Sequence, residues 1–473
     1  MNLARSSLKI FAANIVSAGL GFLGITYFAR EVGAATIGAF FLFQALLGIL
    51  TIPADFGLRG AVEKRISEGD SQSQLLSSAI ALKTVPLIII VIGILLLRPL
   101  INNYLGARLA ILLAAAIVLQ ETAQLAIFVL KGELRVGETA ILRIARQTTW
   151  VGVGAFFVTH GYGSVGLVYG LLAGFGVMLV GGWYKISVTP DRPSIPDARS
   201  LFDYGKYNLI SSIGGKLYSW TDVAVIGFFL TQTQVGAYEI AWRVTAISLL
   251  FSKAIAGTIF PQVSEWKSKD LDERIGGIIT QSITPTLFFV IPAFLGTAVF
   301  SEEILTIVFG EEYAIAAVVL VLLMCDKVFQ SVQLLIGRSL QAIDKPNLAA
   351  QAAIISLVVN ILLNIVFVIE FGILGAALAT VISSLLNDLL HFIYLRRFIS
   401  FRFPRREILE CLSASGMMAI ILYGISVTYA IQSIGKLISS IVFGIVVYII
   451  AVFLMPNLRD RLFDTLRRVG VGV

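Results

Sequence analysis

Long apolar segments recur along almost the whole chain of 473 residues, and they constrain its fold more than any other feature. A helix needs roughly 20 apolar residues to cross the hydrocarbon core of a bilayer. Segments of that length are expected at 8–30, 34–57, 77–97, 108–130, 138–160, 164–184, 207–230, 236–260, 276–298, 313–340, 347–370, 374–395, 408–430 and 436–456. The pattern therefore predicts an all-α polytopic membrane protein with about 14 transmembrane helices.

The composition excludes an ordinary soluble domain. Charged residues make up 14% of the chain and hydrophobic residues 57%, whereas soluble domains carry about 25% charged residues. The net charge of +7 comes from short basic clusters beside the apolar spans. Such clusters indicate membrane orientation, so we expect no nucleic acid partner.

The basic residues also predict the topology. Of the 36 Lys and Arg residues, about 25 fall on the side of both termini, about 4 on the other side and about 7 inside spans. Because cytoplasmic loops carry the excess of Lys and Arg, both termini are expected in the cytoplasm. The chain is expected to be a multi-pass protein of the cell membrane.

A polar, proline-containing segment at 186–205 divides the chain. We predict a six-helix lobe at 1–185, a cytoplasmic linker at 186–205, a second six-helix lobe at 206–397, and two further helices with a basic tail at 398–473. Residues 37–40 (IGAF) recur as 235–238 (VGAY), and 163–167 (GSVGL) recur as 372–376 (GILGA). Six helices separate each pair, which predicts a parallel repeat with a pseudo-twofold axis along the membrane normal and a site between the lobes.

These residues resemble the polysaccharide transporter family of Wzx-type oligosaccharide-lipid flippases, in the multidrug/oligosaccharidyl-lipid/polysaccharide exporter superfamily. The resemblance rests on 221–227 (TDVAVIG) with 235–238, and on 341–346 (QAIDKP) followed by Asn360, Asn364 and 372–376. It implies a V-shaped pair of helical bundles that alternates access and carries a lipid-linked glycan to the outer leaflet. Residues 199–207 are similar to archaeal members, in which the carrier is a dolichol phosphate.

Basic residues within the spans suggest how the anionic headgroup of a lipid-linked glycan would cross the membrane. A phosphate or pyrophosphate cannot enter hydrocarbon unless cations and water line its path. Arg143 can reach the interface and Lys327 can be paired within the protein, so neither basic residue is assigned to the substrate. Asp326 and Lys327 are expected to point in different directions, with one of them meeting another helix. The candidates for a cationic central cavity are Lys83, Arg146, Lys216, Arg243 and Lys253.

Acidic residues within the spans are candidates for a coupling proton or sodium ion, or for structural ion pairs. Glu239 and Arg243 are spaced i, i+4 and can pair on one helix face. Spacing alone does not decide between the two roles. The candidate carboxylates are Asp55, Glu121, Asp222, Glu239 and Asp326.

No catalytic, metal-binding or cofactor-binding motif is recognisable. The two histidines, His160 and His391, lie on separate predicted helices, and there is no GxxxxGK[ST] phosphate loop. We expect a transporter without a cofactor, whose partners are a lipid-linked oligosaccharide, membrane lipid and the glycan assembly machinery. The alternatives are a drug or cation antiporter of the same superfamily, and a polytopic glycan polymerase or ligase.

Overall fold

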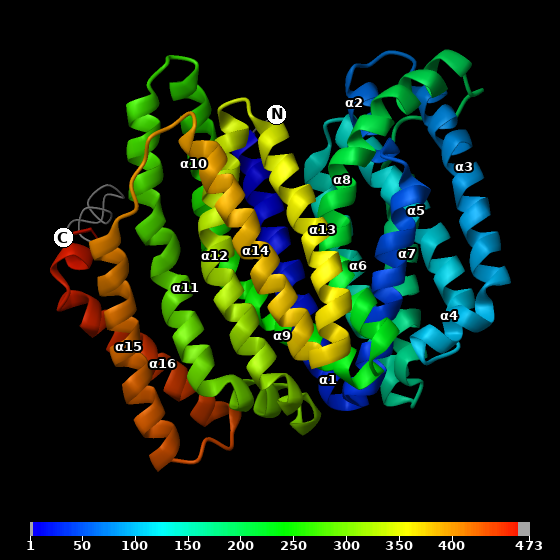
Figure 1. Cartoon of the computed structure of the whole chain (residues 1–473). Helices are drawn as coiled ribbons and strands as arrows, with labels where there is room; N and C mark the ends of the chain where they lie inside the picture. Colours follow the sequence, from blue (N-terminus) through cyan, green and yellow to red (C-terminus); the bar gives the residue numbers. More distant parts are fainter. Residues whose placement is uncertain (1–2, 462–473) are drawn as a thin grey trace. The chain divides into compact units, whose positions relative to one another are not determined.

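The computed structural model describes the backbone of residues 3–461, and the side chains of 13–461 apart from 207 and 210–218. Within these residues every regular element is a helix (Figure 1). The first half contains α1 (Leu3–Asp55), α2 (Leu58–Ser67), α3 (Gln72–Leu96), α4 (Arg98–Leu105), α5 (Ala110–Gly132), α6 (Val136–Thr159), α7 (Gly163–Lys185) and α8 (Ile195–Phe229). The second half contains α9 (Gln232–Ala246), η1 (Ile247–Leu249), α10 (Leu250–Lys267), α11 (Asp272–Val308), η2 (Glu311–Ala316), α12 (Ala317–Ala342), α13 (Pro346–Phe371), α14 (Ile373–Arg396), α15 (Arg405–Thr428) and α16 (Ile434–Phe453).

The predicted all-α polytopic fold is confirmed. Among the described residues, 11 helical segments are long and apolar enough to cross a membrane. One of them, Ala13–Asp55, covers most of both of the first two predicted spans. The span predicted at 138–160 coincides with α6, which is too polar to be among the 11. The span predicted at 207–230 lies along α8, where the apolar stretch with continuously described side chains, Ser219–Phe229, is too short to be among the 11. The predicted number of about 14 is therefore approximate.

Two backbone breaks shape α1. Gly33 has φ 76° and ψ 170°, which interrupts the helix and separates the first two predicted spans. Without a Cβ, glycine adopts this conformation readily. At the other end, Phe56 and Gly57 both have positive φ, so the chain turns sharply after Asp55 and enters α2. This turn returns the first residues of α2 toward the end of α1.

The chain forms two compact units, Met1–Gly236 and Ala237–Val473. In the first unit α6 packs along α7, α1 along α6, and α8 against α1 and α2. This grouping keeps α8 with the helices that precede it, and the division at 186–205, expected from the polar, proline-containing segment, stays a prediction. The linker itself is anchored to the first unit, because Val188 is buried beside Leu201 and the hydroxyl of Ser78 binds both the N–H and the carbonyl of Ser194.

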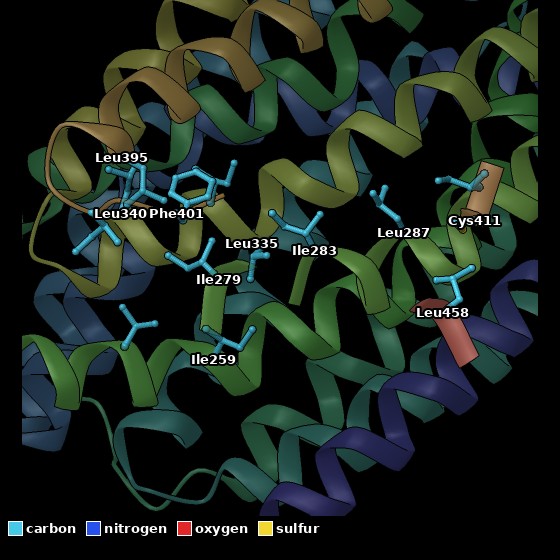
Figure 2. Packing of buried hydrophobic residues seen from close by; sticks show 14 of the residues in the cluster. Ile259, Ile279, Ile283, Leu287, Leu335, Leu340, Leu395, Phe401, Cys411 and Leu458 are labelled. Carbon is cyan, nitrogen blue, oxygen red and sulfur yellow. The ribbon is translucent and has the colours of Figure 1, made fainter. Parts of the chain in front are cut away.

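The second unit has a continuous apolar core (Figure 2). Ile275, Ile279 and Ile283 recur every four residues on α11 and are fully buried, so they form one stripe of the helix. Leu335 and Leu340 of α12 belong to the same cluster. In lipid the hydrophobic effect does not drive helices together, so close packing of such stripes is what stabilises the bundle.

The glycines of the repeated motif have a packing role. A Cβ on Gly38 would overlap the carbonyl of Gln232, and a Cβ on Gly236 would overlap the carbonyl of Ala34. The glycine of each copy therefore lies against the backbone of the residue three positions before the other copy. Only glycine permits such a close approach.

Candidate functional site

Four charged side chains meet in the interior of the first unit. Asp55 ends α1, Arg59 lies in the first turn of α2, Lys83 on α3 and Glu121 on α5. The Lys83 Nζ lies 3.0 Å from Asp55 Oδ1 and 2.8 Å from Glu121 Oε2. Arg59 completes the ring, with Nε 3.3 Å from Asp55 Oδ1 and Nη2 2.5 Å from Glu121 Oε1. We call these four residues the buried ion ring.

The buried ion ring is electrically balanced, because two cations alternate with two carboxylates. Glu121 is 1% exposed and Lys83 is 5% exposed, so neither charge is solvated by bulk water. Removing one partner from a buried pair leaves an uncompensated charge, which costs about 3–5 kcal/mol. Three predicted site residues, Lys83, Asp55 and Glu121, thus lie together, and the Lys83 ammonium is bound by carboxylates within the protein.

Arg59 was not predicted as a site residue, because it lies just after the span predicted at 34–57. The spacing of Asp55 and Arg59, i and i+4, is the signal that could have identified it. That spacing normally pairs residues on one continuous helix. Here the left-handed turn at Phe56 and Gly57 separates α1 from α2, yet the pair still forms.

Arg146 has a different environment. It is half-buried on α6, its Nη2 lies 3.4 Å from Gln147 Oε1, and its guanidinium carbon lies 5.8 Å from the centre of the Phe175 ring. Arg143, one turn earlier, donates from Nη1 to Asn14 Oδ1 at 2.6 Å. Among the described side chains, no carboxylate lies within ion-pair distance of either guanidinium. The pair Arg143 and Arg146 is therefore an uncompensated positive site in the first unit.

Lys216 lies on α8, but its side chain is outside the described residues, so its predicted role stays a prediction. Asp222, six residues further along α8, is 9% exposed and interacts with other residues. Lys253, on α10 in the second unit, is exposed. These three positions remain candidates from the sequence.

Two ion pairs form in the second unit. The Arg243 Nη2 lies 2.9 Å from Glu239 Oε1 on α9, which confirms the geometry expected from the i, i+4 spacing. On α12, Lys327 Nζ donates to Asp326 Oδ2 at 2.8 Å and to Gln330 Oε1 at 3.1 Å. The expectation that Asp326 and Lys327 point apart is wrong, because the long lysine side chain bends back to the preceding residue. Trp242 of α9 lies beside this pair, with its ring centre 5.8 Å from Lys327 Nζ.

Two largely apolar cavities lie within the second unit. One of about 410 Å³ lies among α11, α15 and α16. The other, of about 600 Å³, lies among α11, α12, α14 and α15 and is lined by Asp388 in addition to apolar residues. Within the described part of the chain, no group of three or more His, Cys, Asp or Glu residues is arranged to hold a metal ion.

Comparison with known proteins gives consistent results. The chain matches the family model described as polysaccharide biosynthesis protein over residues 28–318, and that described as lipid II flippase MurJ over residues 214–451. It is 54% identical over 469 residues to the probable low-salt glycan biosynthesis flippase Agl15 of Haloferax volcanii, covering 99% of each chain. It is also 28% identical to the probable flippase AglR of the same organism, covering 79% of each.

A solved structure shares the fold. The structure titled lipid II flippase MurJ, inward closed conformation, matches with a TM-score of 0.82 at 20% identity, covering 96% of this chain and 99% of that chain. At this level of identity the likeness concerns the arrangement of helices alone.

Proposed function

The chain belongs to the polysaccharide biosynthesis protein family, and from that membership we propose that it is a flippase for a lipid-linked glycan. The observation that carries the proposal is the likeness to Agl15, which extends along almost the entire chain. Proteins named flippases move a lipid between leaflets and make no covalent product. The polymerase or ligase alternative has no support from these relatives.

We propose that the cargo is a polyprenyl or dolichyl phosphate or pyrophosphate carrying an oligosaccharide, moved from the cytoplasmic to the outer leaflet by alternating access. The prenyl chains can stay in lipid, so the charged headgroup is what the protein must solvate. Arg143 and Arg146 suit this task, since a guanidinium offers forked donors to phosphate oxygens. An uncompensated positive site disfavours a cationic drug as cargo, which argues against the antiporter alternative.

The other predicted cations enter this proposal in two ways. Lys216 and Lys253 remain proposed headgroup ligands along the path, and Arg243 would contribute from its pair with Glu239. Lys83 is proposed to act through the buried ion ring, by holding α1, α3 and α5 together rather than by binding phosphate. The proposed partners are the lipid-linked oligosaccharide and the enzymes that assemble the glycan.

The proposal is tested by replacing Arg146 in cells that depend on this chain for surface glycan. Losing a hydrogen bond to a charged group costs about 1.5–3 kcal/mol, so Arg146→Ala is expected to lower glycan export about 10- to 100-fold at equal protein level. Lipid-linked glycan should accumulate in the membrane in proportion. Arg146→Lys should retain part of the activity, because it keeps the charge without the fork.

Arg108→Ala is the matched control, since Arg108 is exposed in the turn before α5. It should export glycan as the wild type does. Normal export by Arg146→Ala would exclude Arg146 as a headgroup ligand. Failure of the wild-type chain to restore export in a flippase-deficient strain would exclude the proposed function itself.

A further inference from the structure

Asp388 of α14 faces the 600 Å³ cavity of the second unit without a partner for one of its oxygens. The cavity is lined from α11 and α15 by apolar side chains, including Leu287, Ile291 and Leu412. The other polar or titratable lining residues are Cys325 and Gln333 of α12. Asp388 Oδ2 is shielded from solvent and accepts no hydrogen bond from the described residues. A carboxylate in this position is costly unless something neutralises it.

The neighbouring charges do not neutralise Asp388. Asp326 is fully buried on the adjacent α12, and its charge acts on Asp388. Lys327 is bonded to Asp326 and Gln330, so the Asp326–Lys327 pair is balanced without Asp388. Asp326 Oδ1 is also buried without a hydrogen bond from the described residues. A second negative charge beside Asp326 would therefore be repelled.

The remaining titratable groups around Asp388 are uncharged or distant. His391, one turn along α14, lies with Nδ1 2.8 Å from the carbonyl of Asn387, so Nδ1 must carry the hydrogen and donate it. Its Nε2 lies 3.4 Å from Gln333 Nε2, an arrangement in which the amide donates and the imidazole is neutral. On α13, which packs along α14, the one titratable residue is Glu370, at the opposite end of that helix hairpin.

We propose that Asp388 is a proton-binding site of this chain. A proton neutralises the carboxyl within the apolar cavity and gives its unpartnered oxygen a hydrogen to donate. Sodium fits poorly, because a metal cation of this kind needs several oxygen ligands. Among the described lining residues, only Asp388 and Gln333 offer side-chain oxygens. Deprotonation would place a second negative charge within reach of Asp326, so the two protonation states favour different arrangements of α12 and α14.

This site gives the proposed flippase a means of responding to a proton gradient, an extension that rests on the proposed function. If one protonation state accompanies cargo binding and the other accompanies the return step, then export would depend on proton release and uptake at Asp388. His391 lies one turn further along α14, and its Nε2 can accept the proton that Asp388 releases.

The proton site itself can be tested without cargo. Dicyclohexylcarbodiimide reacts with protonated carboxyl groups in apolar surroundings, and mass spectrometry locates the product. With the full-length chain in phosphatidylcholine vesicles, we expect labelling at Asp388 that falls as the pH is raised. Asp388→Asn should remove this label, Asp388→Glu should retain it, and Glu370→Gln should label as the wild type does.

Labelling that is absent at every pH, or that persists in Asp388→Asn, would overturn the proposal. Protection by sodium ions at constant pH would also overturn it, in favour of a cation site. In cells, Asp388→Asn should lower glycan export at least tenfold and Asp388→Glu should restore part of it. Normal export by Asp388→Asn would refute the coupling role while leaving the proposed flippase function intact, because the wild-type chain would still restore export.

Discussion

Single charges in this protein have roles that depend on which other charges lie within a few ångströms. Lys83 and Arg146 are both basic residues within predicted spans, and their sequence contexts do not distinguish them. The structure places Lys83 between two carboxylates and Arg146 beside an amide and an aromatic ring. The first cation is therefore structural in the present arrangement, and the second remains available to an anion.

The buried ion ring predicts a specific pattern of stability. Lys83→Met should lower the free energy of unfolding by about 3–5 kcal/mol, because Asp55 and Glu121 would share Arg59 alone. The double variant Lys83→Met with Asp55→Asn should recover much of that loss, since Arg59 and Glu121 again balance. Thermal unfolding of the purified chain in detergent would measure both.

The control for the buried ion ring is Lys269→Ala, which removes the cation of an exposed ion pair with Glu265. It should leave the midpoint of thermal unfolding unchanged. If the losses of unfolding free energy in the single Lys83 and Asp55 variants simply added up in the double variant, the two charges would not act together.

The first helix of this chain bends at one glycine, Gly33, and ends just before another, Gly57. The apolar pattern predicted two separate spans within α1, and the backbone break at Gly33 lies between them. It did not predict α2 and α4 as separate short helices, since these segments are not apolar. Hydropathy measures the length of a span, whereas backbone torsions and contacts decide where one helix becomes another.

Replacing the glycines of the repeated motif by larger residues is expected to disturb helix packing. Gly38→Val should lower the unfolding midpoint, because its Cβ would overlap the Gln232 carbonyl, which is backbone and cannot rotate away. Overpacking of this kind costs about 1–3 kcal/mol. Gly236→Val should have a similar effect through Ala34. Gly152→Ala is the control, since no neighbouring atom lies near its Cβ position. Equal unfolding midpoints for all variants would refute the close contacts at Gly38 and Gly236.

At the scale of the whole molecule, the basic residues predict the orientation of the chain in the membrane. Gln234 lies in the first turn of the helical segment Gln232–Lys267, which is long and apolar enough to span a bilayer, and Lys267 ends it. Gln234→Cys and Lys267→Cys, each in a chain whose Cys325 and Cys411 are replaced by serine, should react with an impermeant maleimide from opposite sides. The Lys267 position should be accessible only from the cytoplasm. Labelling of both positions from one side would refute the topology.

The sequence by itself determined that this is an all-α membrane protein, because twenty-residue apolar segments admit no other fold in lipid. It also identified the flippase family, through motifs spread along the chain. Only the tertiary structure decided which charges are neutralised, since Asp55, Arg59, Lys83 and Glu121 come from four helices separated in sequence by up to 66 residues. Asp388 is the opposite case, a carboxyl that the neighbouring helices do not neutralise. It is a candidate proton site because the helices packed around it supply no cation. Sequence spacing predicts ion pairs within one helix. The solvation of a buried charge, by contrast, depends on the other helices that pack against it.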